Sequence, residues 1–369
     1  MDVPAAPVLP DYGGACLDRV VPAILDRAGG VPDWFPAGVA GAAQVVLLVL
    51  DGLGWEQLRE RAGLAPNLSS MAGGPITTVA PSTTATALTS LTTGAPPARH
   101  GVVGYRVRLD DDEVLNVLRW KTGEGDARQR VPPRRFQSLE PFSGTKPAVV
   151  TKAEFHDSGF TGAHLAGARI HGWRMPSTLA HMVAELLAAG ERFVYAYYPG
   201  VDTVAHQLGL GGAYDAEVVA VDGMVGDVLA ALPAGAALMV VSDHGQVDVG
   251  DAVVGVHPEV MDCTRLLSGE GRFRWLHARP GMLDRLEASA DRRHGDDAWV
   301  RTRAAAEAEG WFGGQLDRDF GSRLGDVVLA ARRPVAFLDP ADMGEVTMCS
   351  RHGSLTAGEM LVPLLGARA

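Results

Sequence analysis

The sequence predicts an α/β protein: a doubly wound, mostly parallel sheet flanked by helices, with a small inserted α/β cap. Two observations predict this fold. Continuous apolar runs recur along the chain, as in strands that are buried on both faces of a parallel sheet. Segments with one apolar stripe at helical spacing alternate with these runs, and that alternation is typical of doubly wound sheets.

Four apolar runs are the predicted strands of the main sheet: 44–50, 148–152, 192–198 and 236–241. Helices are predicted between and before them, at 17–27, 177–190 and 216–232. The last of these carries Val218, Val221, Val225 and Val228 on one face, which indicates an amphipathic helix. Strands and helices therefore follow one another as a wound sheet requires.

Two stretches interrupt the alternation. Residues 106–146 are polar and predict an excursion of loops and short strands. Residues 251–334 predict the inserted cap, so that 1–250 and 335–369 form the catalytic core. The predicted cap elements are a strand at 272–278, helices near 282–293 and 299–309, and a strand at 327–329. After the chain returns to the core at 335–339, Thr356 and Glu359 have the spacing of a capping box and predict a final helix.

The stretch 79–104 is rich in threonine and serine, and its apolar residues recur at helical spacing. Pro81 and Ser82 indicate a helix start, and Gly94 indicates a stop. The predicted helix presents hydroxyl groups in its first turn. A helix N-terminus carries partial positive charge and unpaired N–H groups, which favour an alkoxide and a bound phosphate. An ordinary threonine-rich core helix is the alternative interpretation.

Composition restricts the partners that we expect. The chain has 369 residues and a formal net charge of −11, which argues against a nucleic-acid-binding surface.

Three widely spaced cysteines form neither a disulfide framework nor a zinc ribbon, so we expect reduced thiols. The N-terminal stretch lacks a signal-peptide pattern, and no apolar run is long enough to span a bilayer. We therefore expect a cytoplasmic protein without a membrane partner; the oligomeric state is unknown.

Candidate ligands follow the predicted strands, at the edge where open α/β sheets bind their ligands. They are Asp51, Asp202, His206, Asp243, His244 and His352. Taken singly, such an Asp is equally a helix cap, and such a His is more often structural. Together, three carboxylates, three imidazoles and a threonine hydroxyl suffice for two metal sites. Oxygen and nitrogen ligands without thiolate suit Zn²⁺, with Mn²⁺ or Fe as alternatives.

The charge of such a site favours an anionic substrate. Two divalent ions and three carboxylates leave a net positive charge, so a phosphate ester is attracted although the whole protein is acidic. A small-molecule phosphate ester is the expected partner.

The same residues resemble a known family. Asp51, the P-S-T-T run ending in T-G, A-P-P-A-R-H-G, Asp202-x-x-x-His206, S-Asp243-His244-G and R-His352-G match, in order, the signatures of the alkaline phosphatase superfamily. The type I phosphodiesterase/nucleotide pyrophosphatase branch is the most similar. The resemblance covers nearly the whole chain.

The resemblance implies the roles of the residues. It places the catalytic nucleophile at Thr84, with Thr83 as the neighbouring candidate. One zinc ion would be held by Asp51, Asp243 and His244 close to Thr84, and the other by Asp202, His206 and His352. A metal-activated Thr84 alkoxide would attack phosphorus and form a phosphothreonine intermediate, which water then hydrolyses.

Two departures from the family limit the prediction. Ala85, Thr86 and Ala87 follow the nucleophile where nucleotide-cleaving relatives have Phe, Pro and Asn, so an aromatic wall for a base is missing. Tyr105 stands where relatives place a phosphate-binding Asn, and it is either a phosphate donor or a packed aromatic.

The predicted function is therefore a hydrolase that cleaves phosphodiester or pyrophosphate bonds on a two-metal centre. The alternatives are a phosphomonoesterase on the same scaffold and a non-catalytic metal-binding relative. The sequence does not contain the Asp-Ser-Ala nucleophile of such monoesterases or the C/S-x-P-x-R motif of sulfatases. A Ser nucleophile of the phosphoglycerate mutase kind would require Ser82 in a shifted register.

Overall fold

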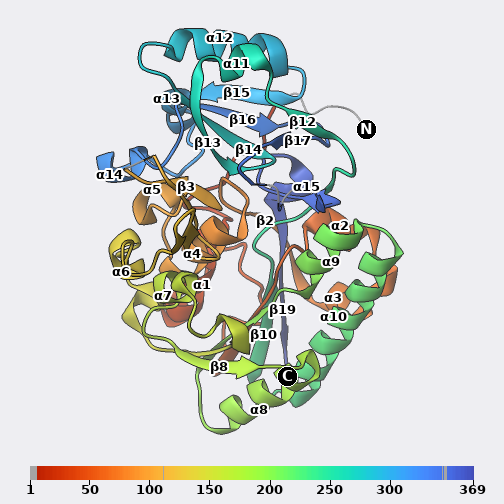
Figure 1. The fold of residues 1–369 in the computed structure, drawn as a ribbon. Helices are drawn as coiled ribbons and strands as arrows, with labels where there is room; N and C mark the ends of the chain where they lie inside the picture. The colour runs from red at the N-terminus through yellow and green to blue at the C-terminus, as the bar shows by residue number, and fades with distance from the viewer. Residues whose placement is uncertain (1–5, 111, 343, 345–346) are drawn as a thin grey trace.

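The computed structural model describes residues 6–110, 112–342, 344 and 347–369. The first five residues of the N-terminal stretch considered for a signal peptide lie outside these ranges. A seven-stranded sheet with helices on both sides fills the lower part of Figure 1, and a smaller four-stranded sheet lies above it. The predicted α/β class, with a mostly parallel sheet, is confirmed.

The main sheet has the strand order β2-β19-β10-β1-β9-β7-β8. The strands are β1 (Gln44–Leu50), β2 (Ala72–Thr77), β7 (Ala148–Lys152), β8 (Arg169–Trp173), β9 (Phe193–Tyr198), β10 (Ala236–Val241) and β19 (Leu361–Arg368). The five strands from β10 to β8 are parallel, whereas β19 is antiparallel to both of its neighbours. All four strands predicted for this sheet are present.

Strand β1 lies between β10 and β9, and its side chains enter both faces of the sheet. Val45, Leu47 and Val49 belong to one apolar cluster, and Val46, Leu48 and Leu50 belong to the other. Alternate residues of a strand point to opposite faces, so a strand covered on both sides must be apolar throughout. This burial on both faces explains why β1 is an uninterrupted apolar run in the sequence.

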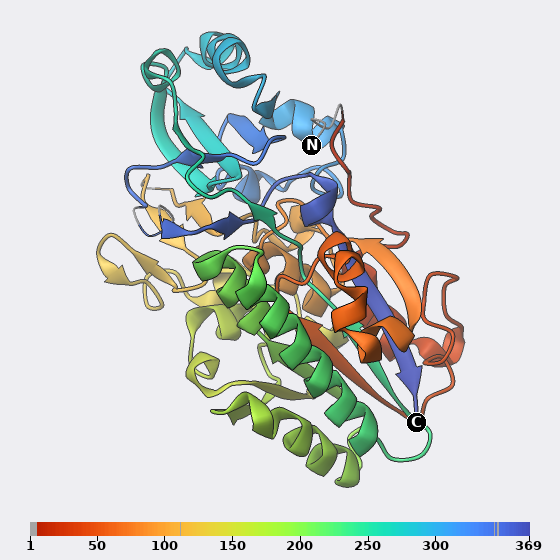
Figure 2. The ribbon, with the colours of Figure 1, turned by 90° about the vertical axis from the view of Figure 1, so that its right-hand side faces the viewer.

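Helices cover the two faces of the main sheet, as Figure 2 shows for the green helices α8, α9 and α10. The elements on that face are α2 (Trp55–Glu60), α3 (Pro66–Ser70), α8 (Leu179–Ala188), α9 (Gly200–Leu208) and α10 (Gly212–Ala231). The opposite face carries α1 (Val20–Leu25), α4 (Thr84–Thr93) and α7 (Gly159–His164). The predicted helices at 17–27, 177–190 and 216–232 correspond to α1, α8 and α10.

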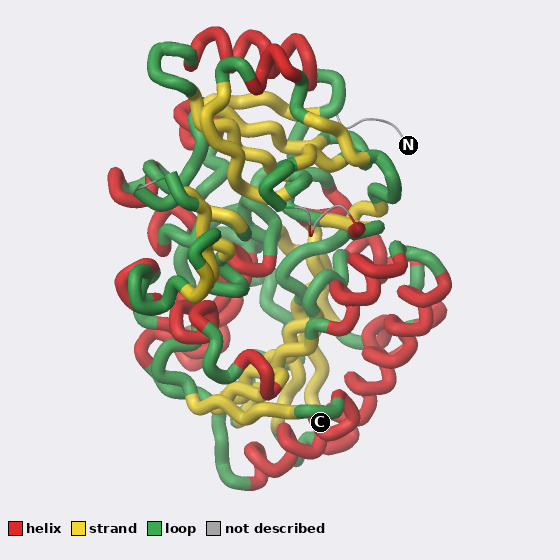
Figure 3. Tube along the Cα trace, in the orientation of Figure 1, coloured by secondary structure: helices red, strands yellow, loops and turns green. Residues whose placement is uncertain are grey.

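The upper sheet has the antiparallel order β13-β14-β16-β15. Its elements are α11 (Pro258–Met261), β13 (Thr264–Glu270), β14 (Phe273–Ala278), α12 (Leu283–His294), β15 (Ala298–Thr302), α13 (Arg303–Ala308), α14 (Arg318–Gly321) and β16 (Val327–Ala331). Arg272 joins this region to the core through a buried bidentate ion pair with Glu359, at 2.7 and 2.8 Å. The strands are yellow in Figure 3.

Two expectations are corrected by the structure, and a third is confirmed. The helix predicted at 299–309 is a strand, β15, followed by α13, because Ala298–Thr302 pairs with β16. Residues 336–338 do not rejoin the main sheet; they form β17 (Ala336–Leu338), parallel to β12 (Val253–Gly255). The predicted final helix is present as α15 (Ala357–Met360), with Thr356 as its N-cap residue; it is one turn long and runs directly into β19.

Short elements complete the fold. The polar excursion contains the antiparallel strands β3 (Arg106–Arg108), β4 (Val114–Asn116), β5 (Lys121–Thr122) and β6 (Gly125–Asp126), and then α6 (Pro133–Phe136). Helix α5 (Pro97–His100) precedes it, and β11 (Val247–Asp248) pairs with β18 (Ser350–Arg351). The excursion of loops and short strands is therefore present as predicted.

Candidate active site

The predicted ligands come from separate segments that meet at the C-terminal edge of the parallel strands. Asp51 follows β1, Asp243 and His244 follow β10 after one serine, Asp202 and His206 lie on α9, and His352 follows β18. Asp202 and His206 are one helical turn apart, and the Asp202 Oδ1 to His206 Nε2 distance is 3.2 Å. The structure thus brings together all six predicted ligands.

Thr84 is the first residue of α4. Thr83 is the N-cap residue in an extended conformation, and Gly94 ends the helix in the left-handed conformation that glycine favours. Thr84 Oγ1 lies 3.1 Å from His244 Nε2, and the side chain is buried. The unpaired N–H groups and partial positive charge of the helix N-terminus therefore lie beside the ligand cluster.

The three histidines are oriented by backbone carbonyl groups. Nδ1 of His206 donates to Ser350 O at 2.7 Å, Nδ1 of His244 to Gly245 O at 3.0 Å, and Nδ1 of His352 to Ser82 O at 2.9 Å. A carbonyl oxygen only accepts, so in each neutral ring Nδ1 carries the proton and Nε2 keeps its lone pair. Metal-binding histidines are commonly held in this way.

The buried carboxylates keep one oxygen each without a hydrogen bond among the described residues, Asp51 Oδ1 and Asp243 Oδ2. Their other oxygens are paired: Tyr197 donates its hydroxyl to Asp51, and the Gly52 and His244 N–H groups donate to Asp243 Oδ1 at 3.1 and 3.0 Å. Burial and the neighbouring carboxylates raise the pKa of Asp51, and burial raises the pKa of Asp243. Such orphaned oxygens fit a bound cation.

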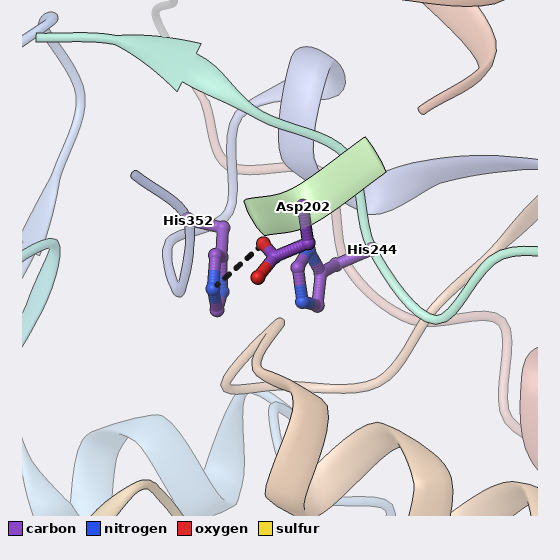
Figure 4. Close-up of side chains that lie close together, drawn as sticks. All are labelled: Asp202, His244 and His352. Atoms are coloured by element: carbon purple, nitrogen blue, oxygen red, sulfur yellow. Dashed lines mark ion pairs between the residues drawn. The ribbon is translucent and has the colours of Figure 1, made fainter. Parts of the chain in front are cut away.

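Two sets of side chains place one ligand atom each within 4.8 Å of one another: Asp51, Asp243 and His244, and Asp202, His244 and His352. Figure 4 shows the second set, in which His352 Nε2 lies 3.7 Å from Asp202 Oδ1. The His244 and His352 rings are stacked at 3.6 Å. His206 lies beside the second set, with its ring 5.2 Å from that of His352. The donors fit two adjacent divalent cations.

Two further residues, which the sequence did not mark as functional, support the ligands. Gln246 donates to Asp202 Oδ1 at 2.6 Å, and its own Oε1 accepts from Ser350 Oγ at 3.0 Å. Tyr197 donates its hydroxyl to Asp51. The sequence contains one indication of a role for Gln246, its position two residues after the candidate ligand His244.

Two cavities of about 230 Å³ each adjoin the ligand cluster, and both are lined by Thr84, Leu118 and Asp202. The first extends along α4 and α7. The second, the cap-side cavity, is lined by Thr83, Tyr105, Arg119, His206, Glu270 and Met348. Tyr105 lines this cavity, and its hydroxyl accepts a hydrogen bond from Asn116 Nδ2 at 2.6 Å.

The fold is that of the alkaline phosphatase superfamily. The model of the type I phosphodiesterase/nucleotide pyrophosphatase family matches residues 45–355. The chain therefore belongs to this family, and it is a hydrolase of the phosphodiesterase/nucleotide pyrophosphatase type. The family depends on divalent metal ions, and the two sets of side chains above are candidate sites for them.

Solved structures show the same fold at low sequence identity. Murine ectonucleotide pyrophosphatase/phosphodiesterase 5 superposes with a TM-score of 0.66 and 15% identity over 87% of each chain. An inactive threonine-to-alanine variant of that murine protein in complex with AMP gives 0.65 and 14%, again over 87% of each chain. The human protein gives 0.65 and 14% over the same shares. A search of curated proteins found no match.

One structural observation concerns membranes. Within the described ranges, every helix is too short or too polar to cross a bilayer.

Proposed function

We propose that the chain hydrolyses phosphodiester or pyrophosphate bonds through a covalent intermediate on Thr84, with two divalent cations, Zn²⁺ in the first instance, held by the predicted ligands. The observation that carries the proposal is the position of the Thr84 hydroxyl, 3.1 Å from His244 Nε2 at the N-terminus of α4. His244 belongs to both candidate metal sets, so the hydroxyl adjoins both.

The proposed ligand assignment divides the six side chains between two ions. Asp51, Asp243 and His244 would hold one ion, and Asp202, His206 and His352 the other. Bound divalent cations would lower the pKa of the threonine hydroxyl and offset the negative charge of the phosphate. The orphaned Asp51 and Asp243 oxygens and the three carbonyl-bound imidazoles support this assignment.

The chemistry of the chain itself follows from Thr84. Its Oγ1 forms a bond to phosphorus while the bond from phosphorus to the leaving oxygen breaks, and the leaving alcohol takes up a proton. Water then attacks the same phosphorus, which breaks the bond to Thr84 and releases a phosphate monoester. The N–H groups of the first turn of α4 would donate to the phosphate oxygens, as helix N-termini commonly do.

A related structure supports a threonine nucleophile. The murine protein in complex with AMP is described as inactive when one threonine is replaced by alanine. In this chain, the Thr84 hydroxyl contacts His244, a proposed metal ligand, whereas Thr83 is the N-cap residue of α4. Both features favour Thr84 as the nucleophile.

The cavities favour a diester over a monoester. A diester carries two groups on phosphorus, and two cavities meet at Thr84 and Asp202. A phosphomonoesterase needs only one such space. Tyr105 lines the cap-side cavity and is the proposed substrate-binding residue there.

Metal content and relative rates test the proposal. We expect two bound metal ions per chain and faster hydrolysis of bis(p-nitrophenyl) phosphate than of p-nitrophenyl phosphate. A preference for the monoester would show that the protein is a phosphomonoesterase. Bound metal without turnover of either ester would show that it is a non-catalytic metal-binding relative.

A further inference from the structure

The first of the two cavities extends from Thr84 into the protein between α4, α7 and the sheet. We name it the Tyr195 chamber and define it by Leu88, Phe155, Phe160, His164, Leu165 and Tyr195, which line it. Its volume of about 230 Å³ exceeds that of engineered apolar cavities of about 150 Å³ that hold benzene. The chamber therefore has room for an aromatic ring or a short alkyl chain.

The chamber contains no strong cation or anion away from the ligand cluster, as far as the described residues show. Asp51 and Asp202, at its metal end, are the only described carboxylates that line it, and no described lysine or arginine does so. Two of its hydroxyl groups already have hydrogen-bond partners in the protein: Ser158 Oγ accepts from Thr161 N at 3.0 Å, and Thr161 Oγ1 donates to Phe155 O at 2.7 Å. A charged group placed here would lose its solvation without gaining an ionic partner.

His164 adds no charge to the chamber. Its Nδ1 donates to Phe160 O at 2.7 Å, and its ring stacks on Phe160 at 4.0 Å. Burial lowers the pKa of His164 to about 4, so the ring is neutral at physiological pH.

Tyr195 supplies one polar group. The side chain is 1% exposed, and its hydroxyl has no hydrogen-bond partner among the residues that the structure describes. A buried donor without a partner is costly, so a ligand atom that accepts a hydrogen bond from the Tyr195 hydroxyl would be stabilised. Mostly apolar walls with a few polar groups are typical of sites for small molecules.

The cap-side cavity differs in charge. Arg119 and Glu270 line it, and Glu270 belongs to β13 of the upper sheet, whereas the described residues that line the Tyr195 chamber away from the ligand cluster are uncharged. The two spaces on either side of Thr84 therefore differ in the kind of ester group that they accommodate.

We propose that the Tyr195 chamber binds an uncharged, apolar ester group of the substrate, an aryl ring or a short alkyl chain, while the cap-side cavity holds the other group. The substrate would then be an asymmetric phosphodiester with one apolar alcohol component. This inference rests on the proposed phosphodiesterase function.

The test uses phosphonates, which carry a single group and whose carbon–phosphorus bond resists hydrolysis. Methyl-, butyl-, phenyl- and 2-carboxyethylphosphonate are compared as competitive inhibitors of bis(p-nitrophenyl) phosphate turnover by the metal-loaded enzyme. We expect phenylphosphonate to have an inhibition constant at least about tenfold below that of methylphosphonate, with butylphosphonate between them. The carboxyethyl compound should bind no better than methylphosphonate. Equal constants across the series would overturn the inference.

Variants locate the effect. Leu165→Trp fills the chamber and should weaken phenylphosphonate at least about tenfold more than methylphosphonate. Leu283→Trp, at a 41% exposed position on α12 in the cap, is the matched control and should leave all constants unchanged. An unchanged preference for phenylphosphonate in Leu165→Trp would place the apolar group elsewhere. If Leu165→Trp weakens inhibition by AMP as much as inhibition by phenylphosphonate, the chamber binds a nucleotide base and the apolar assignment is wrong.

The outcome is separable from that of the proposed function. If the wild-type enzyme does not hydrolyse the diester, the proposed function fails. The same phosphonate series is then compared by thermal stabilisation of the metal-loaded protein. A tenfold difference in affinity between phenyl- and methylphosphonate there supports the chamber assignment on its own, and equal affinities contradict it.

Discussion

Thr84 Oγ1 lies 3.1 Å from His244 Nε2 although the two residues are 160 positions apart in the chain. Because Nδ1 of His244 donates to Gly245 O, Nε2 is the acceptor and the threonine hydroxyl donates to it. The contact connects the N-terminus of α4 with the loop after β10. It places the proposed nucleophile at the point where both candidate metal sets meet.

Replacing Thr84 tests its role. Thr84→Ala should lower kcat for bis(p-nitrophenyl) phosphate by at least about 10³-fold, because the bond to phosphorus would lose its attacking oxygen. Thr84→Ser should retain measurable turnover. Thr83→Ala, which removes the neighbouring hydroxyl at the helix N-cap, is the control. If Thr83→Ala abolishes turnover and Thr84→Ala does not, the nucleophile is Thr83.

Replacing His206 tests whether it holds the second ion. His206→Ala should reduce the metal content from two ions per chain to one and lower turnover at least about hundredfold, since its Nε2 lies 3.2 Å from Asp202 Oδ1. Metal content is measured by elemental analysis after dialysis. His181→Ala, at an exposed position on α8, should keep both ions. Two tightly bound ions in His206→Ala would remove His206 from the site.

Gln246 holds Asp202 in place through its 2.6 Å hydrogen bond. Gln246→Leu should weaken metal binding about 10–100-fold, which is the usual effect of losing a group that orients a metal ligand. Metal titration of the chelated protein measures this effect. The control, Gln207→Leu, changes an exposed side chain on the same helix as Asp202. Identical titration curves for wild type and Gln246→Leu would show that Asp202 needs no such support.

His164 makes part of the stability depend on pH. Its folded-state pKa of about 4 lies below the usual value of 6.5, so the unfolded chain binds the extra proton as pH falls. The stability that His164 contributes is present above pH 6.5 and is lost between that value and about 4. The stability of wild type relative to His164→Gln should therefore fall by about 2 kcal/mol between pH 7 and pH 5 in denaturant unfolding. A pH-independent difference would show that the pKa of His164 is the same in the folded and the unfolded protein.

The main sheet and the convergence of the candidate ligands could be predicted because their signals are local. An apolar run such as Gln44–Leu50 is diagnostic when both faces of a strand are covered, and Asp51 follows it directly. The i, i+4 spacing of Asp202 and His206 needed only a helix to bring the side chains together, and α9 supplies it.

The missed elements depend on tertiary pairing. Strand β19 contains Pro363 and Gly366, which disfavour a strand, yet it pairs with β10 and with β2, where Pro363 faces Pro75. Trp299 was assigned to a helix, but pairing with β16 holds it in a strand. The Tyr195 chamber could not be predicted either, because its walls come from segments that are distant in the sequence.

Trapping the covalent intermediate is the most direct test of the proposed chemistry. The metal-loaded enzyme is mixed with bis(p-nitrophenyl) phosphate, quenched in acid within the first turnovers, digested and analysed by mass spectrometry. We predict that the peptide containing Thr84 gains the mass of a p-nitrophenyl phosphoryl group, that fragmentation places it on Thr84, and that Thr84→Ala shows none. Turnover at the full rate with no adduct on this peptide at any time point would contradict a threonine nucleophile at this position.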